Sequence, residues 1–234
     1  MKRKEKKRKK KRISLWVKLL LIVAVCAGLY FFASSSYFNV TSFQVEGSTY
    51  YSEDEILTMG NCKTGGNIFW GSGLADIKDR LEKDPYMAKV RIKRILPDKI
   101  KIEITERTQI GAVVYGDNYV VIDKDENVLR KTEVEPQLTL IKGLTISKIE
   151  VGQPIEVEEK VQMRQIMDMI VSMNESDMYF KSIEISEAGV KAYVLDYLVC
   201  VRTPQNITQA METGNLQKVI KGLFDINIER GTVK

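Results

Sequence analysis

Arg94-Ile-Leu-Pro-Asp-Lys-Ile-Lys-Ile-Glu-Ile-Thr-Glu-Arg107 is the stretch of this chain that decides its fold. Its apolar residues alternate strictly with polar ones, at Ile100, Ile102 and Ile104. That period of two is typical of a β-strand with one buried face. A similar alternation begins at Val90–Ile92, and Pro97-Asp98 between the two runs is typical of a tight turn. The stretch therefore predicts a β-hairpin.

One strand and two short helices are expected before this hairpin. Residues 40–46 alternate as a strand that ends at Gly47. Ser52, followed three residues later by Glu55, forms a capping box that predicts the start of a helix. A second helix is predicted from the apolar stripe Leu74, Ile77 and Leu81, and it ends at Asp84-Pro85. Residues 67–70 are expected to pack beneath it. The order is strand, helix, helix, strand, strand.

Beyond Arg107 the pattern changes to short strands separated by polar turns, which favours an α+β domain rich in antiparallel pairs. One long helix is predicted at Val157–Met173, with its inward side chains at Val161, Ile166, Met169, Ile170 and Met173. Asn206 is expected to cap a later helix that reaches Lys221 and is interrupted at Gly214-Asn215. Strands at 224–228 and 231–233 are expected to close the chain, the last one short or truncated at Lys234.

The net charge of +5 belongs to a tail and not to the folded part. The tail, Lys2–Arg12, holds ten Lys/Arg and one Glu, so the other residues comprise 26 basic and 30 acidic ones, a balance of about −4. A nucleic-acid-binding domain would carry basic patches on its folded part, so nucleic acid is not expected as a partner. Beside an apolar segment, a basic tail is more typical of topology or of contact with anionic lipid.

A membrane anchor is predicted at Ile13–Ala33, a run of 21 residues interrupted by Ser14 and Lys18. At 1.5 Å per residue it spans about 31 Å, the thickness of the bilayer core. Aromatic residues flank it as interfacial residues do: Trp16, then Tyr30, Phe31, Phe32, Tyr37 and Phe38. The positive-inside rule places the tail in the cytoplasm and the chain after about Ser34 outside. A signal peptide cleaved near Ala33-Ser34 and a lipid-modified Cys26 are the less favoured alternatives.

No motif in the sequence supports catalysis. The chain has no histidine, which excludes Ser-His-Asp and Cys-His nucleophile pairs and removes the commonest zinc ligand. Cys62 and Cys200 are expected to be separate buried thiols, although a pair between them stays open. An acidic cluster, Asp117, Asp123, Asp125 and Glu126, lacks the spacing of a calcium loop and is expected to be a solvated turn. We expect no cofactor and no metal.

The predicted order of elements is that of a POTRA domain, and its place directly after one anchor resembles the FtsQ/DivIB family of bacterial division proteins. The residues that carry the resemblance are Phe43–Gly47, Tyr51–Ile56, Gly66–Phe69, Asp84–Tyr86, Lys93–Asp98 and Ile100–Arg107, followed by Val121–Asp123, Glu126–Val128 and Leu140–Leu144. The similarity covers residues 13–145 well and weakens toward the carboxyl terminus. It implies a tail at 1–12, an anchor at 13–33, a spacer at 34–39, a POTRA domain at 40–107 and a β domain at 108–234.

The resemblance implies a non-enzymatic scaffold of the division septum in the bacterial cell membrane. Such proteins hold FtsL-type and FtsB/DivIC-type coiled-coil partners and help to position septal wall synthesis. The partner is expected to add a strand to the last edge of the β domain, which fits the physics of an unpaired sheet edge. The residues expected to form this site are Ile226, Asn227, Ile228, Arg230, Gly231 and Val233.

Three other functions compete with this hypothesis. An outer-membrane or secretion POTRA protein would show repeated POTRA units or a terminal barrel. A membrane-anchored extracytoplasmic wall enzyme would need a nominated pair of carboxylates, and the sequence points to none. A sensor with an outer ligand-binding domain would need an output domain, for which a 12-residue tail is too short.

Overall fold

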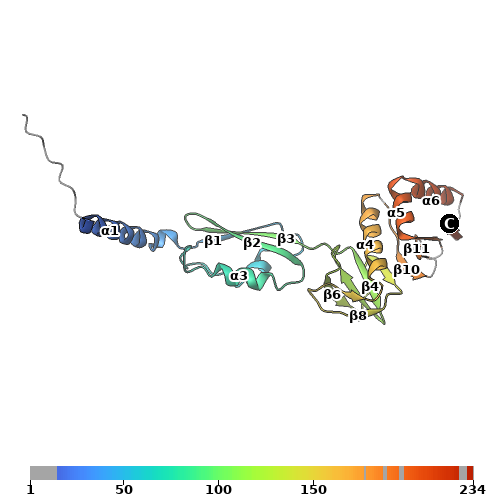
Figure 1. Cartoon of the computed structure of the whole chain (residues 1–234), viewed down its shortest axis with the longest axis horizontal. Helices are drawn as coiled ribbons and strands as arrows, with labels where there is room; N and C mark the ends of the chain where they lie inside the picture. Colours follow the sequence, from blue (N-terminus) through green and yellow to red (C-terminus); the bar gives the residue numbers. More distant parts are fainter. Residues whose placement is uncertain (1–14, 177, 187–188, 195–197, 227–230, 234) are drawn as a thin grey trace, which may run out of the picture.

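The computed structural model describes residues 15–176, 178–186, 189–194, 198–226 and 231–233. Helix α1, the POTRA domain and the β domain follow one another along the long axis of the molecule (Figure 1). Helix α1 comprises the 19 residues Leu15–Ala33 and has no buried residue. It is long and apolar enough to cross a membrane.

The POTRA domain consists of two helices packed on a sheet with the strand order β1-β3-β2. Its elements are η1 (Ser36–Phe38), β1 (Ser42–Glu46), α2 (Glu53–Met59), α3 (Leu74–Leu81), β2 (Met87–Ile95) and β3 (Lys99–Glu106). Strand β3 pairs in parallel with β1 and antiparallel with β2, so it lies at the centre of the sheet. The predicted hairpin is thus β2–β3, and the Leu96–Pro97 peptide in its turn is cis.

The buried face of β3 organises the POTRA core. The core includes Ile100, Ile102 and Ile104 from β3, Ile56 from α2, and Ile77 and Leu81 from α3. The predicted capping box of α2 is confirmed, because the Ser52 hydroxyl accepts from the backbone of Glu55 while the Glu55 side chain accepts from Ser52. Gly47 ends β1 at φ +87°, and a Cβ there would lie 2.1 Å from the carbonyl oxygen of Ile104. Only glycine therefore allows this close approach.

The expected role of Phe38 as an interfacial aromatic is wrong. The short helix η1 turns the chain after α1, so that Phe38 is buried in the POTRA core against Phe69. The expectation for residues 67–70 is partly wrong as well. Ile68 is fully buried in the POTRA core, but the Trp70 side chain remains 57% exposed.

The β domain is built on a mixed sheet whose described strands follow the order β13-β12-β11-β10-β7-β4-β5-β6. The strands of its first half are β4 (Gly111–Tyr115), β5 (Asn118–Ile122), β6 (Val128–Thr132) and β7 (Thr139–Lys142). A small ladder of β8 (Ile146–Lys148) and β9 (Glu156–Val157) follows. The strands of the second half are β10 (Ser182–Ser186), β11 (Gly189–Tyr193), β12 (Leu198–Arg202) and β13 (Gly231–Val233).

Helix α4 (Lys160–Glu175) packs its apolar face on this sheet (Figure 1). The predicted start at Val157 is wrong, because Val157 belongs to β9. The inward position of Val161 is also wrong, since its side chain is 67% exposed. Met163 and Met167 are buried instead, and with Ile166, Ile170 and Met173 they keep the spacings of three and four that one helical face requires.

The two cysteines outside α1 do not pair. Cys62 packs against the POTRA core and Cys200 is buried in the core of the β domain, and both are free thiols. Burial raises the pKa of each thiol to about 11, and at Cys62 it outweighs the lowering by the charge of Arg80. Both side chains therefore stay protonated at neutral pH and act as small apolar groups.

Candidate partner-binding edge

Strand β13 forms one edge of the sheet of the β domain. It pairs in parallel with β12, and the opposed residues are Leu198 and Gly231, Val199 and Thr232, and Cys200 and Val233. Among the described residues, no strand pairs with the other side of β13. Gly231 and Thr232 are exposed, whereas Val233 packs against the core. The free side of this edge offers backbone N–H and C=O groups to an extended segment.

The turn at the end of β12 directs the chain into a helical crossover. Thr203 caps α5 (Pro204–Glu212) by accepting from the backbone N–H of Asn206 at 3.4 Å, and Pro204 occupies the first helical turn. The expected cap at Asn206 is therefore wrong, because Asn206 lies inside α5. The predicted interruption is confirmed, since Gly214 adopts φ +69° between α5 and α6 (Asn215–Asp225). Parallel strands need such a crossover, and α5 and α6 supply it.

A groove of about 430 Å³ lies beside this edge, and β12, β13, α5 and α6 all contribute to its walls. Ile207 and Leu216 form its buried floor, and Val219 and Val233 add partly exposed apolar surface. Arg202, Asn206 and Asn215 supply polar groups at its margin. The groove can therefore accept apolar side chains from a segment paired with β13, while polar groups surround them.

The structure places only some of the predicted site residues at this edge. Gly231 and Val233 belong to β13, and Ile226 is an exposed residue at the end of α6. Asn227, Ile228 and Arg230 lie outside the described residues. The strand expected at 224–228 is wrong at its start, because Phe224 and Asp225 belong to α6.

Two residues that the structure places at this edge and its groove were not named from the sequence, Thr232 in β13 and Val219 on α6. Leu216 and Ile220, the buried residues of α6, are four positions apart and form the face of the helix that packs against the core. Val219 and Phe224 are exposed in addition to them. A surplus of apolar residues on a short helix was the signal that could have pointed to this surface.

The joint between the two domains depends on Arg107, which directly follows β3. Its Nε lies 3.0 Å from Oδ2 of Asp123, and its Nη1 donates to the Pro85 carbonyl at 3.1 Å. Asp123 is only 2% exposed, and its Oδ1 also accepts from the backbone N–H groups of Asp125 and Asn127. The expectation of a solvated turn is therefore wrong for Asp123, which ties the β domain to the POTRA domain.

Glu106 fixes the loop that follows β1 on the POTRA side of this joint. It accepts hydrogen bonds from the Ser48 hydroxyl, from the backbone and hydroxyl of Thr49, and from the backbone N–H of Tyr50. Burial pushes the pKa of Glu106 upward, but these hydrogen bonds outweigh it and hold the pKa below its usual value. The ring of Tyr50 stacks on Tyr86 with 4.1 Å between centroids, which closes the same end of the domain.

Comparison with known proteins agrees with this architecture. The family model described as "POTRA domain, FtsQ-type" matches residues 38–107. A cell division protein DivIB from Clostridium acetobutylicum is 28% identical over 92% of this chain and 87% of its own length. A DivIB from Clostridium botulinum is 24% identical over 99% of this chain and 93% of its own.

Residues 38–107 of the chain are therefore a POTRA domain of the FtsQ type, and the chain is similar to DivIB cell division proteins over most of its length. A cell division protein FtsQ from Syntrophotalea carbinolica is 34% identical over 49% of the chain and 40% of its own length. These relatives are named as cell division proteins, and FtsQ/DivIB proteins are non-enzymatic scaffolds. The chain accordingly has a role in the divisome and is not an enzyme.

Proposed function

We propose that this protein is a bitopic scaffold that binds FtsL-type and FtsB/DivIC-type partners and so stabilises the septal complex. The observation that supports this function is a side of β13 with which no strand of the described residues pairs, together with the apolar groove beside it. A scaffold needs a surface that can recruit another chain, and a free sheet edge next to a groove provides one.

The proposed topology follows from α1 and the basic tail. Helix α1 spans the bilayer, Lys2–Arg12 lies in the cytoplasm against anionic lipid, and both folded domains lie outside at the division septum. A partner that is also anchored in the membrane then meets the β domain on the same side of the bilayer.

The proposed mode of binding is strand addition to β13. An extended partner segment would form main-chain hydrogen bonds with Gly231–Val233 and direct alternate side chains toward Val219 and Val233. The partner segment should therefore carry apolar residues at every second position. The predicted site residues Asn227, Ile228 and Arg230 lie outside the described residues, and their part in the site stays a prediction from the sequence.

A pair of proline variants tests the site. Thr232→Pro removes an N–H from the edge strand and obstructs an added strand, whereas Thr132→Pro makes the same change in β6 at the opposite edge of the same sheet. With the full-length protein in nanodiscs, we expect T232P to weaken binding of the purified coiled-coil partner at least tenfold, or about 1.4 kcal/mol. T132P should bind as the wild type does.

The same two proline variants test whether partner binding at β13 is required for cell division. After depletion of the native protein, a T132P copy should restore division, while a T232P copy should leave cells filamentous although it is present in the membrane. Hydrogen exchange in β10 and β11 should match the wild type in both variants, which separates a local effect from unfolding. Equal partner affinity of T232P and wild type would exclude β13 as the binding edge.

A further inference from the structure

The end of the POTRA domain next to α1 has two segments that each expose a large apolar side chain, Trp70 in one and Leu96 in the other. One is the Trp70 loop, residues 67–72, and the other is the hairpin tip, residues 95–98. The fold brings both to the place where α1 ends, as the positions of α1, β2 and β3 show (Figure 1).

The Trp70 loop is joined directly to the end of α1. The side-chain amide of Asn67 donates to the carbonyl oxygen of Ala33, the last residue of α1, at 2.8 Å. The ring of Trp70 stacks on Tyr30, with centroids 5.6 Å apart and planes inclined by 22°. Tyr30 precedes the end of α1 by three residues, or about 4.5 Å along the axis. Trp70 therefore lies beside the last turn of the apolar helix.

The loop is held firmly, so the exposure of Trp70 is part of the fold. The Ile68 backbone N–H donates to Phe38 at 2.9 Å, and the Val40 N–H donates to Gly66 at 2.9 Å. A Cβ on Gly66 would lie 2.4 Å from the carbonyl oxygen of Gly71, so the loop closes tightly on itself. Despite these constraints, Trp70 is 57% exposed and its described ring contacts are with Tyr30 and Phe69.

The hairpin tip is fixed at the same end. The Arg94 Nε donates to the Ile68 carbonyl at 2.7 Å, and the Thr41 backbone N–H donates to Asp98 at 2.8 Å. These bonds leave Leu96 exposed at 58%, with Ile95 partly exposed beside it. Arg94 and Lys99, on either side of the tip, are exposed basic residues. The hairpin tip thus exposes an apolar side chain, Leu96, between two positively charged residues.

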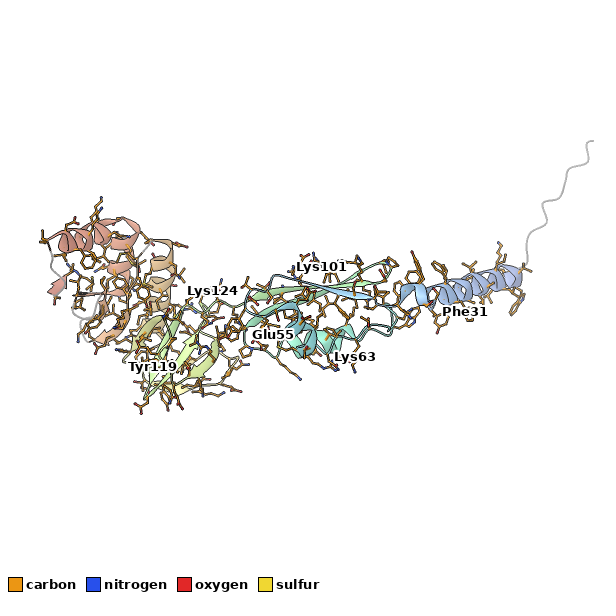
Figure 2. The ribbon with its side chains drawn as sticks, turned by 180° about the vertical axis from the view of Figure 1, so that it is seen from behind. Phe31, Glu55, Lys63, Lys101, Tyr119 and Lys124 are labelled. Carbon is orange, nitrogen blue, oxygen red and sulfur yellow. The ribbon has the colours of Figure 1, made fainter. Side chains whose placement is uncertain are left out.

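We propose that this end of the POTRA domain rests on the lipid surface, with Trp70 and Leu96 in the interfacial layer and Arg94 and Lys99 near phosphate groups. The proposal rests on the membrane anchor proposed above. The bilayer is the favoured occupant because α1 spans about 28 Å, which places its last turn at the interface. Tryptophan prefers this layer, and basic side chains next to it favour anionic headgroups. Figure 2 shows Phe31 on the same helix, close to the POTRA domain.

The two tryptophans of the chain, Trp16 and Trp70, allow a direct test. Trp16→Phe leaves Trp70 as the only tryptophan of the full-length protein. The protein is reconstituted in nanodiscs of phosphatidylcholine and phosphatidylglycerol, with or without bromine on the acyl carbons nearest the headgroup. We expect Trp70 to lose most of its fluorescence in the brominated discs and to resist quenching by aqueous iodide.

Two further single-tryptophan proteins define the surface. With both native tryptophans replaced by phenylalanine, Leu96→Trp should be quenched by the brominated lipid as Trp70 is. Tyr115→Trp, at an exposed position in β4 of the β domain, should be quenched by iodide and not by the lipid. Equal lipid quenching at positions 96 and 115 would overturn the contact of the hairpin tip.

A Trp70→Phe protein separates failure of the docking from failure of the anchor, because it reports Trp16 at the basic end of α1. Quenching of Trp16 by brominated lipid together with an unquenched, iodide-accessible Trp70 would leave the anchor intact and overturn the docking. If neither tryptophan responds to the lipid, the anchor itself fails. A Trp70 shielded from both quenchers would indicate contact with protein and would also overturn the lipid proposal.

Discussion

Replacing Glu106 by glutamine should loosen the loop after β1 without unfolding the POTRA domain. The Glu106 carboxylate accepts hydrogen bonds from Ser48, Thr49 and Tyr50, and it is partly shielded from water. Hydrogen bonds to a charged group contribute roughly 1.5–3 kcal/mol each to stability. Here water can bond to some of the freed donors, and the contributions of the individual hydrogen bonds are not additive, so the total loss is smaller than their sum. The Gln side chain keeps one oxygen that accepts hydrogen bonds. Its NH₂ group replaces the other oxygen and cannot accept from the N–H and O–H groups of the loop. We therefore expect a net cost of about 2 kcal/mol, or roughly a 30-fold increase in loop opening.

Hydrogen exchange measured by mass spectrometry on the full-length protein in nanodiscs would report this change. The amides of Thr49 and Tyr50 should exchange roughly 30-fold faster in Glu106→Gln, while those of β2 stay protected. Glu103→Gln is a matched control on the same strand, because Glu103 pairs with Lys93 and Lys101 at the solvent-exposed surface. Such pairs contribute little to stability. If E106Q and E103Q exchange alike at the loop, the carboxylate of Glu106 does not hold it.

Acidification should reproduce the Glu106→Gln effect in the wild type. The pKa of Glu106 is lower in the folded protein than in the unfolded loop, so the unfolded loop binds more protons. The protection of the Thr49 amide from hydrogen exchange is therefore complete above the ordinary pKa of Glu. It is lost as the pH falls through the lowered pKa of Glu106. After correction for intrinsic exchange, E106Q should lack this pH dependence. At the domain joint, Arg107→Met should broaden the distribution of spin-label distances between the two domains, because it removes the link from Asp123 to the Pro85 carbonyl. Lys124→Met, an exposed neighbour near the same joint (Figure 2), should leave that distribution unchanged.

The POTRA domain could be predicted from sequence because its signals are local. Strand β3 pairs with β1 on one side and β2 on the other, and its alternating isoleucines all lie on the buried face of the sheet. The alternation of apolar and polar residues is therefore enough to identify the strand. The Ser52 capping box depends on backbone geometry within a few residues, and the positive φ of Gly47 is a local property that favours glycine. Such features need no knowledge of distant partners.

The errors arose where a distant contact or a short apolar run decided the outcome. Asp123 appears solvated in sequence, but Arg107 reaches it from the preceding domain. Phe38 is apolar like the interfacial residues before it, and only the fold of η1 turns it into the core. Phe224–Ile228 is too short a run to distinguish a strand from the end of a helix. The candidate edge at β13 could be foreseen as a terminal strand, but its groove depends on how α5 and α6 pack.

The two joints of this molecule have a mechanical consequence for the proposed scaffold. Asn67 and Trp70 connect α1 to the POTRA domain, and Arg107 connects the POTRA domain to Asp123 of the β domain. Because the links follow one another along the chain, they restrict how far β13 can move relative to the membrane. A partner anchored in the same membrane has a high effective concentration at β13 only under one condition. The length of its segment between the membrane and the paired strand must match the distance of β13 from the membrane. Firm joints therefore favour partners of one length, whereas a flexible joint would accept a range of lengths at a lower effective concentration.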